Sequence, residues 1–361
     1  MSESNSSTAT RTAPTSTPEE KNMPGVSDPY IREQLEKRRN ELHTVISAAA
    51  PADPATPLLD LLSEVDSALH RMDEGTYGIC PACNGSVETD RLLADPLVTL
   101  CLDHLSSDEQ RALERDLELA ARVQRGLLPR SDVGFQDWRV HYRYHPAGMV
   151  SGDYCDLILP ANVEGELVFL LGDVAGKGVA ASLLMTHLHA MFRSLASVDL
   201  ALDKLLEMAN SVFCQSTIAG QYATLICGRA GRRGEIEIGS AGHLAALLIS
   251  KEGVRQVCST GVPLGMFGTS RYTIDRLQME PGDSLLLYTD GISEATNTTG
   301  VEYGVSRLST IAAERHGWVP QELAAACMKD VQNHSAGHKQ ADDQTLMVVH
   351  RADTIQLSLN D

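Results

Sequence analysis

The chain has 361 residues, of which 43% are hydrophobic and 22% are charged, enough for two or three globular domains with a sizeable core. Forty-eight acidic residues against 30 basic ones give a formal net charge of -18, which disfavours binding to nucleic acid or to an anionic membrane through a broad basic face. No apolar stretch reaches the roughly 18 residues that span a bilayer, and the N-terminus carries no hydrophobic signal region. We therefore expect a cytoplasmic protein with no membrane contact.

The two ends of the chain differ from its middle in composition. Residues 1–28 are rich in Ser, Thr, Pro and Glu and hold almost no large apolar side chain. Such a segment buries too little surface to offset its chain entropy, so we predict a disordered tail there and a short tail over residues 353–361.

Two apolar repeats with helical spacing follow the N-terminal tail. The first includes Ile31, Leu35 and Leu42, and the second runs from Leu58 to Met72 in steps of four and three residues. The segment between them, AAAPADPATP, holds three prolines, which end one helix and allow the next to begin. We predict an antiparallel helical hairpin.

A cysteine cluster comes directly after the hairpin. Cys80 and Cys83 form one C-x2-C pair, and Cys101 and His104 form a C-x2-H pair that seventeen residues separate from the first. Three thiolates and one imidazole complete a closed tetrahedral zinc shell, which is typical of a structural site. Chance proximity of unpaired cysteines is the alternative, but two matched half-sites at a usual separation favour zinc.

The stretch from ALHRMDEGTYGICPAC to CLDH, with the hairpin before it, resembles the DksA/TraR family of bacterial zinc-finger transcription regulators. In that family the hairpin tip reaches into RNA polymerase and carries a short acidic motif. The tip here carries only Asp53, and His104 stands where many relatives have a fourth cysteine. The resemblance implies a zinc-finger domain over residues 29–105.

A third helical pattern joins the two halves of the chain over residues 106–130. Ser106 followed by Glu109 predicts an N-terminal capping box, and Pro129 ends the helix. A seam at four- and three-residue spacing is typical of a two-stranded coiled coil and hence of a homodimer, whereas packing onto its own domain explains the same pattern. Both readings stay open for the seam residues, which are Leu113, Leu117, Ala120, Gln124 and Leu127.

Short apolar runs separated by turn residues fill the chain from about residue 131 to 352. Strands joined by hairpin-sized loops indicate antiparallel sheets, and the two intervening helical patterns, near 180–196 and 200–215, must cover them. We predict an α+β domain of two antiparallel β-sheets sandwiched by helices. The predicted strands are VHYRY, ELVFLLGDV, YATLICGRA, EIEIGS, LAALLIS, SLLLYTD and TLMVVHR.

Aspartates recur at turns beside these strands. Each motif alone is compatible with an ordinary turn, but carboxylates brought together without His or Cys partners need hard divalent cations to neutralise them. Oxygen-only ligation selects magnesium, manganese or calcium. The motifs are SGDYCD with Asp153 and Asp156, LLGDVAGKG with Asp173, LLLYTDGISEA with Asp290, and ADDQT with Asp342 and Asp343.

These four motifs, in this order, resemble the SpoIIE/RsbU-like branch of the metal-dependent (PPM-type) serine/threonine protein phosphatases, over residues 117–350. The resemblance implies that Asp173 bridges two Mn2+ or Mg2+ ions. Asp153 and the carbonyl of Val174 would hold one ion, and Asp290 and Asp342 the other.

Further positions follow from the same resemblance. Asp156 and Asp343 become supporting candidates, and the AGH turn places His243 close to the catalytic face. Ser151 replaces the usual first glycine of the GGD turn, which is tolerated if its backbone avoids a positive φ. LLGDVAGKG lacks the spacing of a Walker loop.

The implied activity is hydrolysis of a phosphoserine or phosphothreonine on a protein, by a water that the two ions bridge and acidify. No protein nucleophile is required, so Cys155 has no covalent role. The branch implies an anti-sigma-factor antagonist as substrate, and the zinc finger implies regulation. The alternatives are a zinc-finger regulator acting on RNA polymerase and a catalytically weak scaffold.

Overall fold

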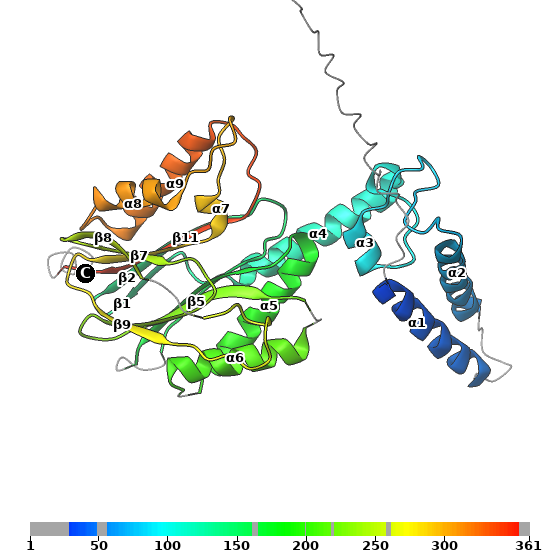
Figure 1. Cartoon of the computed structure of the whole chain (residues 1–361), viewed down its shortest axis with the longest axis horizontal. Helices are drawn as coiled ribbons and strands as arrows, with labels where there is room; N and C mark the ends of the chain where they lie inside the picture. The colour runs from blue at the N-terminus through cyan, green and yellow to red at the C-terminus, as the bar shows by residue number, and fades with distance from the viewer. Residues whose placement is uncertain are drawn as a thin grey trace, which may run out of the picture. The chain divides into compact units, whose positions relative to one another are not determined.

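The computed structural model divides into two compact units, residues 1–113 and 114–361 (Figure 1). The predicted tails and Asp53 lie outside the described residues, apart from residue 353. The described residues are 29–48, 56–160, 165–198, 200–217, 220–257 and 261–353.

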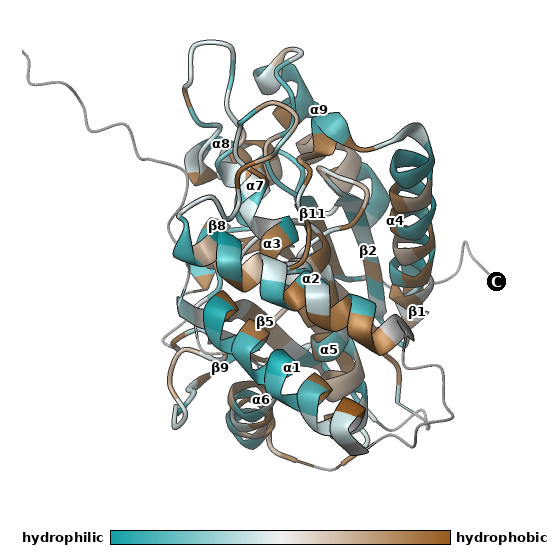
Figure 2. Ribbon diagram, turned by 90° about the vertical axis from the view of Figure 1, so that its right-hand side faces the viewer, coloured by the Kyte–Doolittle hydropathy of each residue, from teal (hydrophilic) through white to brown (hydrophobic). Residues whose placement is uncertain are grey.

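The first unit begins with the predicted hairpin, formed by α1 (Pro29–Ala48) and α2 (Thr56–Asp73). Apolar side chains at helical spacing on both helices share one core. An ion pair of 2.7 Å joins Arg32, near the start of α1, to Asp73 at the end of α2, so the two helices run antiparallel as predicted. Figure 2 shows that α1 is largely hydrophilic, whereas α2 carries several hydrophobic segments.

Two short helical elements lie near the cysteine cluster in the sequence of this unit. These are α3 (Thr89–Ala94), which the sequence analysis did not predict, and the 3-10 turn η1 (Leu102–His104). The connector helix α4 follows at Ser107–Leu127. Its capping box is confirmed, because the Glu109 carboxylate accepts from the Ser106 N–H at 2.8 Å and the Ser106 hydroxyl accepts from the Glu109 N–H at 3.3 Å.

The second unit holds two antiparallel sheets, which confirms the predicted fold class. One sheet has six strands in the order β1-β2-β11-β10-β7-β8 and the other has five in the order β3-β4-β5-β6-β9. The bounds of the six-stranded sheet are β1 (Asp132–Phe135), β2 (Trp138–His145), β11 (Gln344–Arg351), β10 (Ser284–Tyr288), β7 (Ala246–Ser250) and β8 (Gly253–Val257). Those of the five-stranded sheet are β3 (Asp153–Ile158), β4 (Leu167–Val174), β5 (Ala223–Ala230), β6 (Glu235–Ala241) and β9 (Ile274–Gln278).

Apolar alternation along the strands produces four layers. On β4, Phe169 and Leu171 point into the core between the two sheets, while Leu170 faces the helices outside. The outer face of the five-stranded sheet is covered by α5 (Gly178–Leu195) and α6 (Leu202–Ser216). The other sheet is covered by α8 (Val305–Ala313) and α9 (Pro320–Ser335).

The seven predicted strands and the helices α5 and α6 are all present. The sequence analysis did not list β1, β3, β8, β9, α8 and α9, whose apolar patterns are short or broken. None of the described helices has the length and apolar character needed to cross a membrane.

Candidate functional site

Antiparallel pairing brings the aspartate motifs to one edge of the sandwich. Asp153 opens β3 and stands directly opposite Asp173, near the end of β4. On the other sheet, β10 ends two residues before Asp290 and β11 begins two residues after Asp342, and these two strands are neighbours. Segments that lie far apart in the chain therefore present their carboxylates at the same end of the fold.

Hydrogen bonds to Asp153 join the two sheets at this edge. The Thr289 hydroxyl donates to Asp153 Oδ2 at 3.0 Å, and the Thr345 hydroxyl donates to the same oxygen. Thr289 and Thr345 also pair with each other through the backbone, at 3.0 Å. Asp153 is 1% exposed, so its position is set from both sheets.

The carboxylates are close enough to disfavour one another's charged forms. Burial, together with the facing Asp173 carboxylate, raises the pKa of Asp153 well above its usual value. Burial and the carboxylates of Asp290 and Asp342 raise the pKa of Asp173 to about 7. Burial and Asp342 likewise raise the pKa of Asp290. These shifts indicate a shared site that lacks sufficient positive charge of its own.

Asp343 differs from Asp342 in what it contacts. Its two carboxylate oxygens accept backbone N–H groups from Ala147 at 2.7 Å and from Gly152 at 2.8 Å. The side chain thus ties the segment before β3 to the start of β11. Asp342 instead forms an ion pair, in which its Oδ2 lies 2.7 Å from the Lys177 Nζ.

Close packing surrounds two glycines of the motifs, tightly at Gly152 and too closely for any side chain at Gly291. A Cβ on Gly152 would lie 3.2 Å from the Val174 carbonyl oxygen, and one on Gly291 would lie 2.0 Å from the Asp343 carbonyl oxygen. A side chain at Gly291 would therefore push Asp290 away from the β11 motif. Ser151 is not among the described residues with a positive φ, which explains why serine is accepted there.

Lys177 is a candidate site residue that the sequence analysis passed over, because in LLGDVAGKG only Asp173 and Val174 were given a role and the Walker-loop reading of the lysine was rejected. Its ammonium group contacts Asp342 and donates to the Ala341 carbonyl at 2.8 Å. The lysine lines a cavity of about 210 Å3 that also includes Asp342, Glu294 and Lys339. The sequence offered one signal for it, a lysine four residues after Asp173 and directly before α5.

Asp156 does not belong to this carboxylate group. It is fully buried, and Arg193 of α5 donates two hydrogen bonds to it at 2.6 and 2.8 Å. His189 lies 3.4 Å from the same carboxylate. This ion pair fastens α5 to β3, which is a supporting role.

His243 lies between the two sheets behind the carboxylates. Its Nε2 is 3.2 Å from the Tyr288 carbonyl oxygen and its Nδ1 is 2.8 Å from the Thr224 hydroxyl. Because a carbonyl only accepts, Nε2 carries the proton and Nδ1 accepts from Thr224. Burial lowers the pKa of His243 to about 4. Thr224 pairs with Asp173 in the β4–β5 register, so the histidine supports the site without reaching it.

The donor set of this edge suits hard divalent cations. Carboxylates and the Val174 carbonyl are oxygen ligands, the class that Mg2+ and Mn2+ prefer. Within the described residues, the set of ligand atoms that all lie within 4.8 Å of one another is the Cys/His group and not the aspartates. The aspartate carboxylates are more widely spaced than the Cys/His ligands.

The structure also gathers Cys80, Cys83, Cys101 and His104 into one group. Cys83 Sγ lies 3.8 Å from Cys101 Sγ, which in turn lies 3.2 Å from His104 Nδ1. Zinc–sulfur bonds of about 2.3 Å in a tetrahedron place two sulfurs about 3.8 Å apart. The Gly85 N–H lies 3.3 Å from Cys83 Sγ. The site is therefore compatible with zinc.

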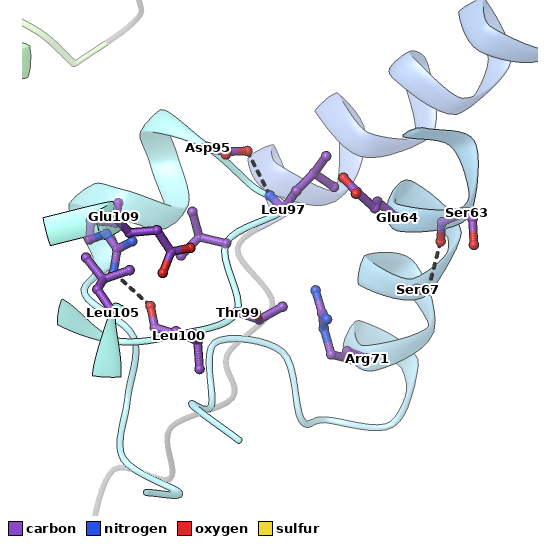
Figure 3. A pocket seen from close by; sticks show the side chains of 12 residues that line it. Ser63, Glu64, Ser67, Arg71, Asp95, Leu97, Thr99, Leu100, Leu105 and Glu109 are labelled. Carbon is purple, nitrogen blue, oxygen red and sulfur yellow. Dashed lines mark hydrogen bonds between the residues drawn. The ribbon is translucent and has the colours of Figure 1, made fainter. Parts of the chain in front are cut away.

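The first unit also holds a cavity of about 500 Å3 (Figure 3). Arg71 of α2 lines it together with Glu64 and Glu109, and Arg91 is held there by the Leu100 carbonyl at 2.7 Å. Its mixed charges show no preference for one class of ligand.

A family model described as Stage II sporulation protein E (SpoIIE) matches residues 163–352, more than half of the chain. The chain belongs to the SpoIIE family. The match includes Asp173, Asp290 and Asp342. It begins after the Cys/His group and after Asp153.

The chain is similar to several curated relatives, two of which are named phosphoserine phosphatases. It is 28% identical over 266 residues to Protein IcfG of Synechocystis, covering 65% of this chain and 41% of IcfG. It is 24% identical over 242 residues to phosphoserine phosphatase RsbP of Bacillus subtilis, covering 65% and 58%. Phosphoserine phosphatase RsbU of the same organism is 24% identical over 194 residues, covering 53% and 57%. The chain thus spans about half the length of these relatives.

Solved structures agree on the fold. The SiaA-PP2C domain of Pseudomonas aeruginosa superposes with a TM-score of 0.59 at 19% identity, covering 68% of this chain and 98% of that one. The PP2C domain of SpoIIE from Bacillus subtilis, with part of its regulatory domain, gives 0.53 at 19% identity, covering 60% and 64%. The sandwich is therefore a PP2C-type fold.

Proposed function

We propose that this protein is a metal-dependent protein phosphatase that hydrolyses phosphoserine or phosphothreonine. The observation that carries the proposal is the convergence of four aspartates at one edge of a PP2C-type sandwich, where burial and the neighbouring carboxylates raise the pKa values of Asp153, Asp173 and Asp290. Membership of the SpoIIE family supports it, as do two relatives named phosphoserine phosphatase.

The ligand roles follow the positions of the side chains. The Asp173 carboxylate raises the pKa of Asp153, and Asp290 and Asp342 raise the pKa of Asp173. Asp173 therefore interacts with both groups of carboxylates, which suits a ligand shared by two ions. Asp153 and the Val174 carbonyl would complete one side, and Asp290 and Asp342 the other. These five residues form the proposed catalytic metal centre.

When bound, two Mn2+ or Mg2+ ions would supply the positive charge that activates water and stabilises the phosphoryl group during hydrolysis. The chain's own residues hold the ligands in place, with Asp343, Thr289 and Thr345 fixing the loops that carry them. Cys155 is buried, and burial raises the pKa of its thiol well above the usual value, so it is no nucleophile. Lys177 is the cation placed beside Asp342.

The Cys/His group would hold one structural Zn2+ that stabilises the first unit. Four protein ligands leave no open position, which fits a structural ion. We further propose that this unit regulates the phosphatase, because helix α4 passes without interruption from one compact unit into the other. The predicted seam residue Leu113 of α4 is 37% exposed, and we keep a homodimer through this helix as part of the proposal.

The substrate we propose is a phosphorylated anti-sigma-factor antagonist of a bacterial partner-switching pathway. The support is the resemblance of the four motifs to the SpoIIE/RsbU-like branch and the names of the relatives. The partial exposure of the Asp342 side chain, 41%, agrees with it, because a phosphoserine on a protein surface can approach that part of the site from solvent.

The enzyme is tested with purified full-length chain, an aryl phosphate and a phosphoserine protein, each with and without Mn2+. We expect phosphate release that depends on Mn2+ or Mg2+ and that Asp290→Asn abolishes without loss of fold. Full turnover by Asp290→Asn would refute the catalytic assignment. No release by the wild-type chain with either ion would favour the scaffold alternative.

Regulation and substrate need a second experiment. The full chain and a fragment of residues 117–352 are assayed side by side on phosphoproteins from the source cell. Equal rates and equal metal dependence would remove the regulatory role of the first unit. Failure to act on any phosphorylated antagonist would remove the proposed substrate, and tight binding of the full chain to RNA polymerase would favour the regulator alternative.

A further inference from the structure

Helix α4 meets the sandwich through one buried polar side chain. Its buried residues are Ala121 and Gln124, and Gln124 is 5% exposed. The Gln124 Nε2 donates to the Ser151 carbonyl at 2.7 Å, and the Gln124 Oε1 accepts from the Ser151 N–H at 3.0 Å. The amide thus binds both backbone groups of one residue, two positions before Asp153.

The loop from Ser151 to Asp153 has each backbone N–H satisfied by a different part of the fold. Ser151 N–H goes to Gln124, Gly152 N–H to Asp343, and Asp153 N–H to the Ser151 hydroxyl at 3.1 Å. The Gly152 carbonyl accepts from the Val174 N–H at 3.3 Å. The loop is therefore hydrogen-bonded by Gln124 of α4 on one side and by Asp343, directly before β11, on the other.

The end of α4 is fixed to the sandwich just beyond this contact. Leu128 packs against both the core between the sheets and the core beneath α5 and α6. The Pro129 carbonyl accepts from the Tyr142 hydroxyl at 2.6 Å. Gln124 lies about one helical turn before this anchor, so a rotation of α4 at Gln124 would pull on the Ser151 backbone.

We propose that Gln124 is a positioning residue that sets the affinity of the catalytic centre for its cations, by holding the loop that carries Asp153 and faces Val174. The inference rests on the proposed metal centre. Through the Gln124–Ser151 hydrogen bonds, a change in the position of α4 would also change the loop that carries Asp153. The coiled-coil seam read from the sequence loses one member, because Gln124 faces its own domain.

A buried amide that served only to fill space would be replaceable by a side chain of similar shape. Gln124→Met keeps the length and flexibility of the side chain but leaves the Ser151 N–H and C=O unpaired. Gln124→Glu keeps an acceptor for the N–H and removes the donor to the carbonyl. Gln110→Met makes the same chemical change at an exposed position of the same helix and is the matched control.

The experiment measures Mn2+ binding to the full chain directly, by the electron paramagnetic resonance signal of free Mn2+, without substrate. We expect Gln124→Met to weaken binding by about 10-fold or more, as loss of residues behind metal ligands commonly does, with Gln110→Met unchanged. In the phosphatase assay the Mn2+ concentration for half-maximal rate should rise more than kcat falls. Amide exchange at Ser151 and Asp153 should become faster.

Wild-type Mn2+ affinity in Gln124→Met, or an equal loss in Gln110→Met, would overturn the proposal. If Gln124→Met does not fold, Gln124→Glu takes its place under the same criteria. A chain that binds Mn2+ in the expected order of variants but hydrolyses no phosphoester would contradict the proposed function while supporting the role of Gln124. A wild-type chain that binds no Mn2+ would overturn both.

Discussion

Asp153 and Asp173 stand directly opposite one another on the antiparallel strands β3 and β4. Side chains at opposite positions of an antiparallel pair lie about 5 Å apart at Cβ, so two buried carboxylates there repel each other. A sequence selected only for stability would avoid this pair. Its presence at the edge where Asp290 and Asp342 also lie is what a cation-binding site requires.

The first prediction concerns this repulsion. Asp173→Asn removes the most strongly shared negative charge, so in the presence of EDTA at pH 7.5 we expect the variant to be more stable than the wild type by about 1–2 kcal/mol. It should bind Mn2+ far more weakly and lose activity. The measurement is urea denaturation followed by tryptophan fluorescence, since both tryptophans, Trp138 and Trp318, lie in the second unit. Asp275→Asn on the exposed part of β9 is the control. Lower stability with unchanged Mn2+ affinity would contradict the assignment.

The second prediction separates two adjacent aspartates. Asp343→Ala leaves the N–H groups of Ala147 and Gly152 without their acceptor, so it should cost about 2–4 kcal/mol of unfolding free energy. Asp342→Ala loses a half-exposed side chain, so it should cost less than about 1 kcal/mol while weakening Mn2+ binding. Denaturation and Mn2+ titration of both variants check this. Weaker Mn2+ binding in Asp343→Ala than in Asp342→Ala, with the smaller loss of stability in Asp343→Ala, would show that the two roles are exchanged.

The third prediction concerns zinc. Cys80→Ser should remove the bound Zn2+, measured by metal analysis after dialysis, and should loosen the first unit in far-ultraviolet circular dichroism, since metal binding and folding are coupled in such sites. Cys327→Ser changes a buried cysteine of the second unit and should leave the zinc content at one per chain. One tightly bound Zn2+ in Cys80→Ser would mean that the ligand set is wrong.

The fourth prediction is a pH dependence at His243. The pKa is about 4 in the folded chain against 6.5 for an exposed histidine, so the unfolded chain binds the proton first. Stability from the neutral ring is complete above pH 6.5 and decreases as the pH falls toward 4. Between pH 7.5 and 5 the wild type should lose about 2 kcal/mol more than His243→Gln. The exposed His338 supplies the control variant His338→Gln, which should follow the wild type. Equal losses in all three would place His243 in a solvated environment.

The sequence by itself determined the features that depend on local order. Apolar spacing predicted the hairpin, the connector helix and seven strands, and the Ser106–Glu109 pair predicted the start of α4. The two half-sites from Cys80 to His104 and the four aspartate motifs were visible because short motifs place several ligands in a few residues. Local turns and repeats need no knowledge of the rest of the chain.

Only the tertiary structure decided what these residues face. Asp342 and Asp343 are neighbours in sequence, yet one lies at the open edge beside Lys177 and the other is turned inward to hold Gly152. Gln124 has the spacing of a coiled-coil seam but binds Ser151 of its own domain. The register of strands and the docking of a helix arise from contacts between residues many positions apart, so the direction of each of these side chains is set by the packing of the whole domain.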